Sequence, residues 1–271
     1  KFLDQEGKAI LIELKELLSN INDWKEDSSI HSVIDEDGTQ MWFRLNPARE
    51  SPESAPIFLI LHGHGTTSRP TFYSEPKWNI IAPIDNFGLD NKGSWWIGVD
   101  GDKSTSNLLS LVVTKSKNLL NSKKDVSLCI YGSSMGGYGA ILNADRLNAD
   151  AVYANVPQIR LLGSTYSELG MKKYFHAALG EDPDEVYNDL NNYIRTVKRK
   201  YPLFFICENR FGQRNYLQQQ TMSFVGTLEE LQINFHLEIV PTSGHNKNLG
   251  LREVRALFEK YLPQLNHLIE Q

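Results

Sequence analysis

Short apolar runs alternate with helix-forming segments along most of the chain, and this alternation is the strongest constraint on the fold. The runs cover residues 57–63, 79–85, 126–132, 150–157, 202–208 and 235–241. Continuous apolar runs predict strands that are buried on both faces, because a strand with one solvated face alternates apolar and polar residues. Strands separated by helices form a parallel sheet with helices on both faces. We therefore expect an α/β fold with a mostly parallel central sheet.

The segments between these runs predict the helices. Helical patterns cover residues 104–121 and run from Met135 to about Leu147, and a last helix begins near Leu249. The Asp182-Pro183-Asp184-Glu185 stretch combines a cap, a proline at the first position and a glutamate, as a helix start does. Each predicted strand of the sheet can therefore be followed by a helical crossover.

The first 45 residues differ from the rest. Residues 1–22 place apolar side chains at helical spacing and predict an amphipathic helix. Residues 31–45 predict a hairpin around an Asp37-Gly38 turn, which would add antiparallel strands at one edge of the sheet. We expect an N-terminal helical extension over residues 1–30 and a single domain over residues 31–271.

The composition excludes several classes of protein. The 271 residues are 41% hydrophobic and 23% charged with a net charge of −5, and the Lys and Arg residues are scattered, so we expect no nucleic-acid partner. Cys129 and Cys207 lie inside strand-like runs, which predicts buried small hydrophobes rather than a disulfide framework. No stretch predicts a transmembrane helix or a signal peptide, and we expect a cytoplasmic protein.

The segment Gly132-Ser133-Ser134-Met135-Gly136 fits the G-x-S-x-G pattern. It follows a predicted strand and precedes a predicted helix, which is the placement that a nucleophile elbow requires. In such an elbow the serine sits in a strained turn, and its neighbours must lack bulky side chains. We predict that Ser134 is an exposed nucleophile and that Ser133 is a spacer.

A serine hydroxyl needs a base to become a good nucleophile. His245 follows the last predicted strand and precedes the final helix, so it is the candidate base. The third member of a triad would follow the preceding strand, where the chain offers Glu208 and no aspartate. We predict Glu208 as this acid, although Asn209 could orient the imidazole without a charge, and Glu208 could instead form a local salt bridge with Arg210.

An oxyanion hole needs backbone N–H groups that face the developing negative charge. One would come from Met135, the residue after the nucleophile, and the other from the loop after the first apolar run. In that loop Gly63 would let the backbone turn and His64 would donate its N–H. A metal-binding pair of His62 and His64 is the competing interpretation, but no acidic ligand follows at close spacing, and we expect no metal.

Trp95 and Trp96 lie side by side in a loop rich in glycine and aspartate, at residues 90–102. Flat indoles beside carboxylates suit sugar rings, so one indole could anchor the loop while the other binds substrate. The alternative is that both tryptophans only pack the loop onto the body of the protein.

Four stretches resemble a known group of enzymes. They are the Gly93–Ile97 stretch (GSWWI), the elbow GSSMGGYGA at 132–140, Asn155-Val156-Pro157-Gln158 and SGHN at 243–246. Over about residues 55–262 the chain resembles the α/β-hydrolases, and within them the bacterial capsular-polysaccharide O-acetyltransferases. The chain departs from that group at 207–215 (CENRFGQRN), where the group has an aspartate-containing loop.

The resemblance implies that Ser134 receives an acyl group, that His245 is the base and that acetyl-CoA is the donor co-substrate, with no bound cofactor. The acceptor would be a hydroxyl group of a carbohydrate or capsular polysaccharide. With water as the acceptor, the same residues would make an esterase or deacetylase. A non-catalytic carbohydrate-binding scaffold is a third hypothesis, which an intact serine and histidine pair disfavours. The sequence does not predict an oligomeric state.

Overall fold

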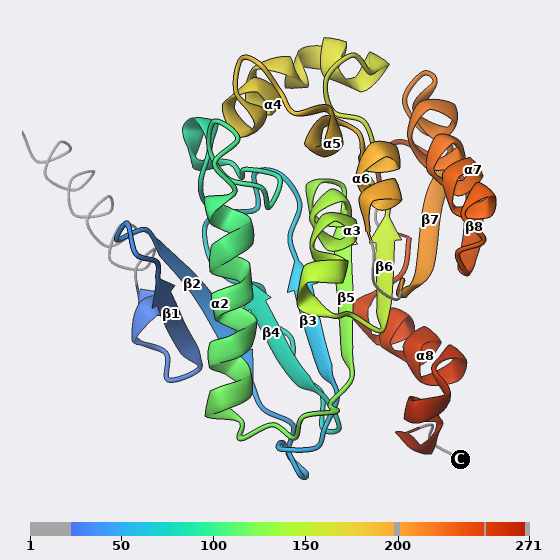
Figure 1. Ribbon diagram of the computed structural model, residues 1–271. Coiled ribbons are helices and arrows are strands. Elements are labelled where there is room, and N and C mark those ends of the chain that lie inside the picture. The colour runs from blue at the N-terminus through green and yellow to red at the C-terminus, as the bar shows by residue number, and fades with distance from the viewer. Residues whose placement is uncertain (1–22, 198–200, 247, 269–271) are drawn as a thin grey trace, which may run out of the picture.

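An eight-stranded sheet runs through the protein in the computed structural model, which describes residues 23–197, 201–246 and 248–268 (Figure 1). The strands lie in the order β1-β2-β4-β3-β5-β6-β7-β8. Their bounds are β1 Ile30–Ile34, β2 Gln40–Asn46, β3 Ile57–Leu61, β4 Asn79–Pro83, β5 Leu128–Ser133, β6 Ala151–Asn155, β7 Leu203–Phe211 and β8 Phe235–Ser243. Each of the six predicted apolar runs therefore forms a strand.

The sheet is parallel from β4 to β8 and antiparallel at the other edge, where β1 pairs with β2 and β2 pairs with β4. The predicted hairpin is confirmed, and Gly38 adopts a φ of 82° in its turn, a conformation that glycine accepts without steric cost. The predicted helix over residues 1–22 lies outside the described residues.

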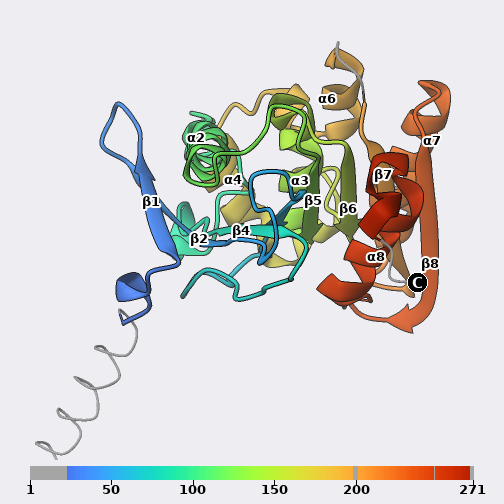
Figure 2. The ribbon, with the colours of Figure 1, turned by 90° about the horizontal axis from the view of Figure 1, so that it is seen from below.

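Helices cover both faces of the sheet. Their bounds are α2 Ser104–Leu119, α3 Met135–Leu147, α4 Lys172–Leu179, α5 Glu185–Asn188, α6 Leu190–Thr196, α7 Ser223–Glu230 and α8 Leu251–Tyr261. Helices α2 and α3 lie on one face, and α8 lies on the other (Figure 2). None of the helices in the described part of the chain has the length and apolarity needed to cross a membrane.

Side chains that alternate along the strands form two cores, one on each face. Leu59 of β3 belongs to the core beneath α2 and α3, whereas its neighbour Phe58 packs with Phe258 of α8 in the other core. Cys129 and Cys207 are free and buried in this second core, as predicted. Burial on both faces explains why the central strands carry no alternating polar residues.

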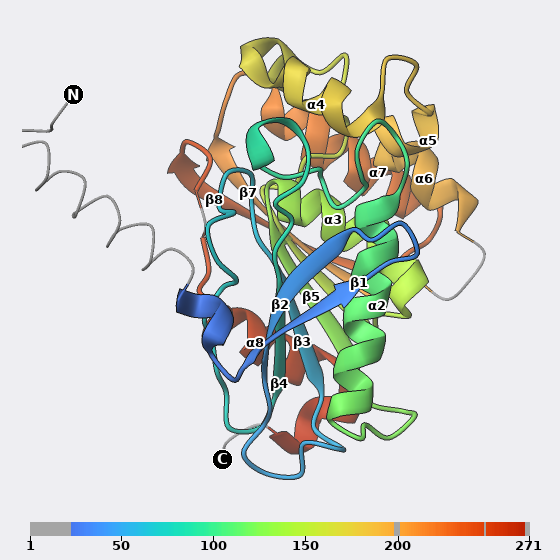
Figure 3. The ribbon, with the colours of Figure 1, turned by 90° about the vertical axis from the view of Figure 1, so that its left-hand side faces the viewer.

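The segment that contains α4 and α5 lies across the end of the sheet where the parallel strands terminate (Figures 1 and 3). The predicted helix start at 182–185 is off by two residues. Asp184, rather than Asp182, caps the helix by accepting a hydrogen bond from the Val186 amide, and α5 is four residues long. This segment brings side chains from the middle of the chain to the end of the sheet that carries the elbow.

Candidate active site

Ser134 lies in a strained turn between β5 and α3. Its φ of 55° and ψ of −116° lie in a region that non-glycine residues rarely adopt. The turn is tight on both sides. A Cβ on Gly132 would lie 1.9 Å from the carbonyl oxygen of Gly136, and a Cβ on Gly136 would lie 2.2 Å from the carbonyl oxygen of Leu61. The two glycines of the G-x-S-x-G pattern are therefore required sterically, as a nucleophile elbow requires.

The hydroxyl of Ser134 contacts a buried amide. Nε2 of Gln158 donates a hydrogen bond to Oγ of Ser134 at 3.1 Å, and Oε1 of Gln158 accepts one from the indole nitrogen of Trp95. Burial raises the pKa of Tyr166, and a side-chain hydrogen bond from Gln158 opposes that rise. Gln158 thus joins the serine to an indole and to a phenol.

His245 lies in the loop after β8, between two tyrosine rings. It stacks on Tyr166, with ring centroids 5.8 Å apart, and meets Tyr216 edge to face at 5.2 Å. Burial lowers the pKa of His245 to about 4, so the imidazole is neutral at physiological pH. Its Nε2 is buried and has no hydrogen-bond partner among the described residues. Nε2 of His245 therefore makes no hydrogen bond to Oγ of Ser134 in this structure, although catalytic hydrogen bonds are often long before substrate binds.

Two buried asparagines fix the loop that carries His245. Nδ2 of Asn209 donates to the carbonyl oxygens of Gly244 at 3.3 Å and Asn246 at 3.2 Å, the residues on either side of the histidine. Nδ2 of Asn155 donates to the same Asn246 carbonyl at 3.2 Å and to Oγ of Ser133 at 3.1 Å. Asn155 therefore ties the histidine loop to the nucleophile elbow.

The carboxylate oxygens of Glu208 hydrogen-bond to groups other than His245. One carboxylate oxygen of Glu208 accepts from the backbone N–H of Asn209 at 2.8 Å, and the other accepts from Oγ1 of Thr221 at 2.8 Å. Burial raises the pKa of Glu208 to about 7, although both hydrogen bonds oppose the rise. A carboxylate beside an imidazole would raise the pKa of the imidazole, but burial alone sets that of His245. The side chains that support the histidine loop are the amides of Asn209 and Asn155.

The predicted oxyanion donors lie beside Ser134. Met135 is the first residue of α3, so its backbone N–H has no carbonyl acceptor within the helix. A Cβ on Gly63 would lie 3.3 Å from the Ser133 carbonyl oxygen and 4.0 Å from Cβ of Ser134, which places the backbone before His64 against the elbow. The oxyanion hole stays a prediction, which the position of Gly63 beside the elbow supports.

His62 and His64 have different surroundings, which do not suit a shared metal. Nδ1 of His62 bonds the Gly63 carbonyl at 2.8 Å, and its Nε2 accepts from the backbone N–H of Asp85 at 2.8 Å, so both nitrogens are engaged. The ring of His64 instead stacks on Trp95, with centroids 5.2 Å apart. Within residues 23–197, 201–246 and 248–268, no group of three or more His, Cys, Asp or Glu side chains could hold a metal ion.

Trp95 and Trp96 both pack inside the protein, with exposed fractions of 0%. Asp85 fixes their loop, because its carboxylate accepts from the backbone N–H groups of Ser94 at 2.9 Å and Trp96 at 3.0 Å. A Cβ on Gly139 of α3 would lie 2.3 Å from the ring of Trp96. In this structure neither indole offers a free face to a sugar, and Trp95 reaches the site through Gln158.

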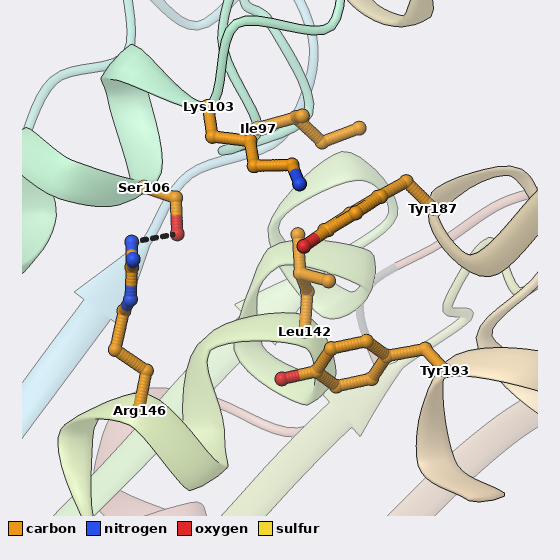
Figure 4. A pocket seen from close by; sticks show the side chains of 7 residues that line it. All are labelled: Ile97, Lys103, Ser106, Leu142, Arg146, Tyr187 and Tyr193. Atoms are coloured by element: carbon orange, nitrogen blue, oxygen red, sulfur yellow. Dashed lines mark hydrogen bonds between the residues drawn. The ribbon is translucent and has the colours of Figure 1, made fainter. Parts of the chain in front are cut away.

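A separate cavity of about 80 Å³ lies between the start of α2, the second half of α3 and the α5–α6 segment (Figure 4). Its lining residues are Ile97, Lys103, Ser106, Leu142, Arg146, Tyr187 and Tyr193. Nζ of Lys103 lies 4.2 Å from the ring centroid of Tyr187, and Arg146 donates to Oγ of Ser106 at 3.1 Å. The nucleophile and the histidine of the candidate site are not among these residues.

The sequence did not single out Gln158, Asn155, Tyr166 or Tyr216 as site residues. Gln158 and Asn155 had a recognisable signal, because both belong to the NVPQ stretch directly after a predicted strand, where parallel-sheet proteins place functional side chains. Tyr166 and Tyr216 had none, since tyrosines far from the motif in sequence reach the histidine only through the tertiary fold.

Solved structures share this architecture over most of the chain. S-formylglutathione hydrolase from Agrobacterium tumefaciens is 17% identical with a TM-score of 0.59, covering 88% of this chain and 92% of its own. A fluorophosphonate-binding serine hydrolase of Staphylococcus aureus is 15% identical with a TM-score of 0.61, covering 79% of this chain and 90% of its own. The capsule O-acetyltransferase of Neisseria meningitidis serogroup A is 16% identical with a TM-score of 0.59, covering 84% and 91%.

No protein-family model matches the chain, and a comparison with curated proteins finds no match. The structural likeness therefore rests on the backbone, since the identities are too low to carry an activity from one protein to another. The strand order, the helices on both faces and the strained turn after β5 agree with that likeness. The chain has the α/β-hydrolase fold.

Proposed function

We propose that the protein is a serine-dependent acyl-transfer enzyme in which Ser134 is the nucleophile and His245 is the base. The observation that supports this most strongly is that Asn155 links the elbow of a strained serine to the loop of a buried, neutral imidazole whose Nε2 has no hydrogen-bond partner. An imidazole with its pKa lowered to about 4 stays neutral over the physiological range and can accept a proton there.

In the first step, Nε2 of His245 takes the hydroxyl proton of Ser134 while Oγ bonds the acyl carbon. The carbonyl electron pair moves onto its oxygen, which the backbone N–H groups of Met135 and His64 stabilise. The intermediate then collapses to an acyl-serine, and the leaving group departs with the proton held by His245. In the second step, His245 removes a proton from the acceptor, whose oxygen attacks the acyl-serine. The bond from the acyl carbon to Oγ then breaks, and His245 returns the proton to Oγ of Ser134.

The carboxylate of Glu208 makes no hydrogen bond to the imidazole in this mechanism. Asn209 and Asn155 keep His245 in position through the backbone on either side of it, and Tyr166 and Tyr216 hold the ring by packing. A carboxylate partner also stabilises the imidazolium that forms during the reaction. We therefore expect turnover to be slower than in a complete serine, histidine and acid triad.

For the overall reaction, we propose O-acetyl transfer from acetyl-CoA to a hydroxyl group of a carbohydrate or polysaccharide. The GSWWI and NVPQ stretches support this choice, because Trp95 and Gln158 from these stretches meet at Ser134. The capsule O-acetyltransferase of similar fold has also been solved in complex with CoA. Hydrolysis of acyl esters is the second candidate, since S-formylglutathione hydrolase has the same fold.

Product analysis separates the two candidates. The protein and its Ser134→Ala variant would be incubated with acetyl-CoA, with and without a panel of bacterial glycans, and CoA release and glycan mass would be followed. We expect glycan-dependent CoA release and acetylated glycan from the native protein and neither from the variant. Rapid hydrolysis of p-nitrophenyl acetate that ignores glycan, with no acetylated product, would favour the esterase and overturn the transferase.

A further inference from the structure

The side chain of Gln158 is completely buried and meets three different groups beside the nucleophile. Its Oε1 faces the indole nitrogen of Trp95, and its Nε2 lies 3.1 Å from Oγ of Ser134. The amide also lowers the pKa of Tyr166, against the rise that burial causes. A buried amide must satisfy both of its ends, and this one does so with three side chains from separate segments.

The chemistry of these partners fixes which end of the amide faces Ser134. An indole N–H can only donate, so the atom that faces Trp95 must be the amide oxygen. The NH₂ group then faces the other way, and it donates to the hydroxyl oxygen of Ser134. Trp95 therefore ensures that Oγ of Ser134 accepts a hydrogen bond from Gln158 and does not donate one to it.

This direction leaves the proton of Ser134 free for the base. Because Oγ accepts from Gln158, the hydroxyl hydrogen of Ser134 can turn toward another acceptor. Nε2 of His245 is such an acceptor, since it is buried and has no hydrogen-bond partner. An amide turned the other way would hold that proton on its oxygen and compete with the imidazole. The orientation of one amide thus decides whether the serine can be activated.

On the basis of the proposed function, we propose that Gln158 is a further catalytic residue, which donates an N–H to Oγ of Ser134 during acyl transfer. As the Oγ–H bond breaks and the proton moves to His245, negative charge grows on Oγ before the bond to the acyl carbon is complete. Negative charge grows on Oγ again when the acceptor displaces it. A hydrogen bond to a charged oxygen is stronger than one to a neutral oxygen, so this N–H stabilises both transition states.

The role of Gln158 is distinct from that of the oxyanion hole. Met135 and His64 face the carbonyl oxygen of the substrate, whereas Gln158 faces the oxygen of the enzyme. Trp95 is then a positioning residue that acts through Gln158, which gives a buried tryptophan a place in the reaction without contact with substrate.

Glu in place of Gln158 tests the proposal with little change in shape. At pH 8 the carboxylate of Gln158→Glu can accept from Trp95 and from Ser134 but has no N–H to donate. We expect the rate constant for labelling of Ser134 by a fluorophosphonate to fall about 10- to 100-fold. Between pH 5 and 7 we expect the rate to recover partly, since a protonated carboxyl can donate its O–H to Oγ. Gln218→Glu, at an exposed position, is the matched control and should label at the native rate.

Trp95→Phe is the second variant, because it keeps a flat ring and removes the N–H that orients the amide. We expect a smaller fall in the same rate constant, a lower kcat with p-nitrophenyl acetate and an unchanged KM. Thermal melts of both variants establish that they fold.

Two outcomes would overturn the role of Gln158. The first is a native labelling rate in folded Gln158→Glu at pH 8. The second is a labelling rate that falls by the same factor at every pH, which indicates a structural role alone. A native protein that does not label on Ser134 would instead refute the proposed function, so the two failures are distinguishable.

Discussion

The surroundings of Glu208 lead to a prediction that distinguishes this site from a complete catalytic triad. Burial raises its pKa from 4.5 to about 7, so the native state holds a proton that the unfolded chain releases near pH 4.5. Stability therefore falls as pH rises from about 4.5 to 7 and stays lower above pH 7. At 1.36 kcal/mol for each pH unit of separation, ionised Glu208 costs the native state about 3 kcal/mol at most.

Glu208→Gln removes this cost, because an amide can accept from the Asn209 N–H and donate to the hydroxyl of Thr221. We expect the variant to match the native protein at pH 4.5 and to exceed its free energy of unfolding by about 3 kcal/mol at pH 8.5. Urea unfolding at both pH values measures the difference, and contributions from other groups cancel between the two proteins.

Activity provides the second half of the same test. Since Glu208 bonds Thr221 and the Asn209 amide rather than His245, Glu208→Gln should label with a fluorophosphonate within about threefold of the native rate. Loss of the orienting acid in a serine protease triad lowers turnover by about 10⁴-fold. A comparable loss, or a stability difference that does not change with pH, would refute this account of Glu208.

Three further predictions follow from the same site. Gly132→Ala should destabilise the fold by about 3 kcal/mol in urea unfolding, because its Cβ would lie 1.9 Å from a backbone oxygen, and native stability would contradict the tight elbow. Asn209→Asp removes the amide that holds the loop after β8. Backbone hydrogen exchange in that loop should accelerate, and fluorophosphonate labelling of Ser134 should slow about tenfold. Unchanged hydrogen exchange would argue against this role of Asn209. The labelling rate of the native protein should be half-maximal near pH 4 and level above pH 6, since His245 must be neutral to act, whereas a midpoint near 6.5 would indicate a solvated imidazole.

The fold follows from the sequence because burial on both faces leaves a local signature. The segments 57–61 (IFLIL) and 128–131 (LCIY) are apolar without interruption, and the elbow after the second segment needs its glycines for steric reasons. The hairpin has an equally local cause in Gly38. These features depend on residues that are neighbours in the chain.

The site is less predictable because its contacts join distant segments. Glu208 lies within β7 rather than after it, and its side chain bonds Thr221, a residue of the following helical segment. Trp95 lies in a loop that looks exposed by composition, yet the buried carboxylate of Asp85 folds that loop inward. The direction in which a side chain turns depends on partners that sequence spacing does not reveal.

The central claim is that Ser134 is a nucleophile activated by His245, and mass spectrometry after fluorophosphonate treatment tests it most directly. We predict a single adduct on the peptide that contains Ser134, the same adduct in Ser133→Ala, none in Ser134→Ala, and labelling at least about a thousandfold slower in His245→Ala. An adduct on another residue, or native labelling of folded His245→Ala, would contradict the claim.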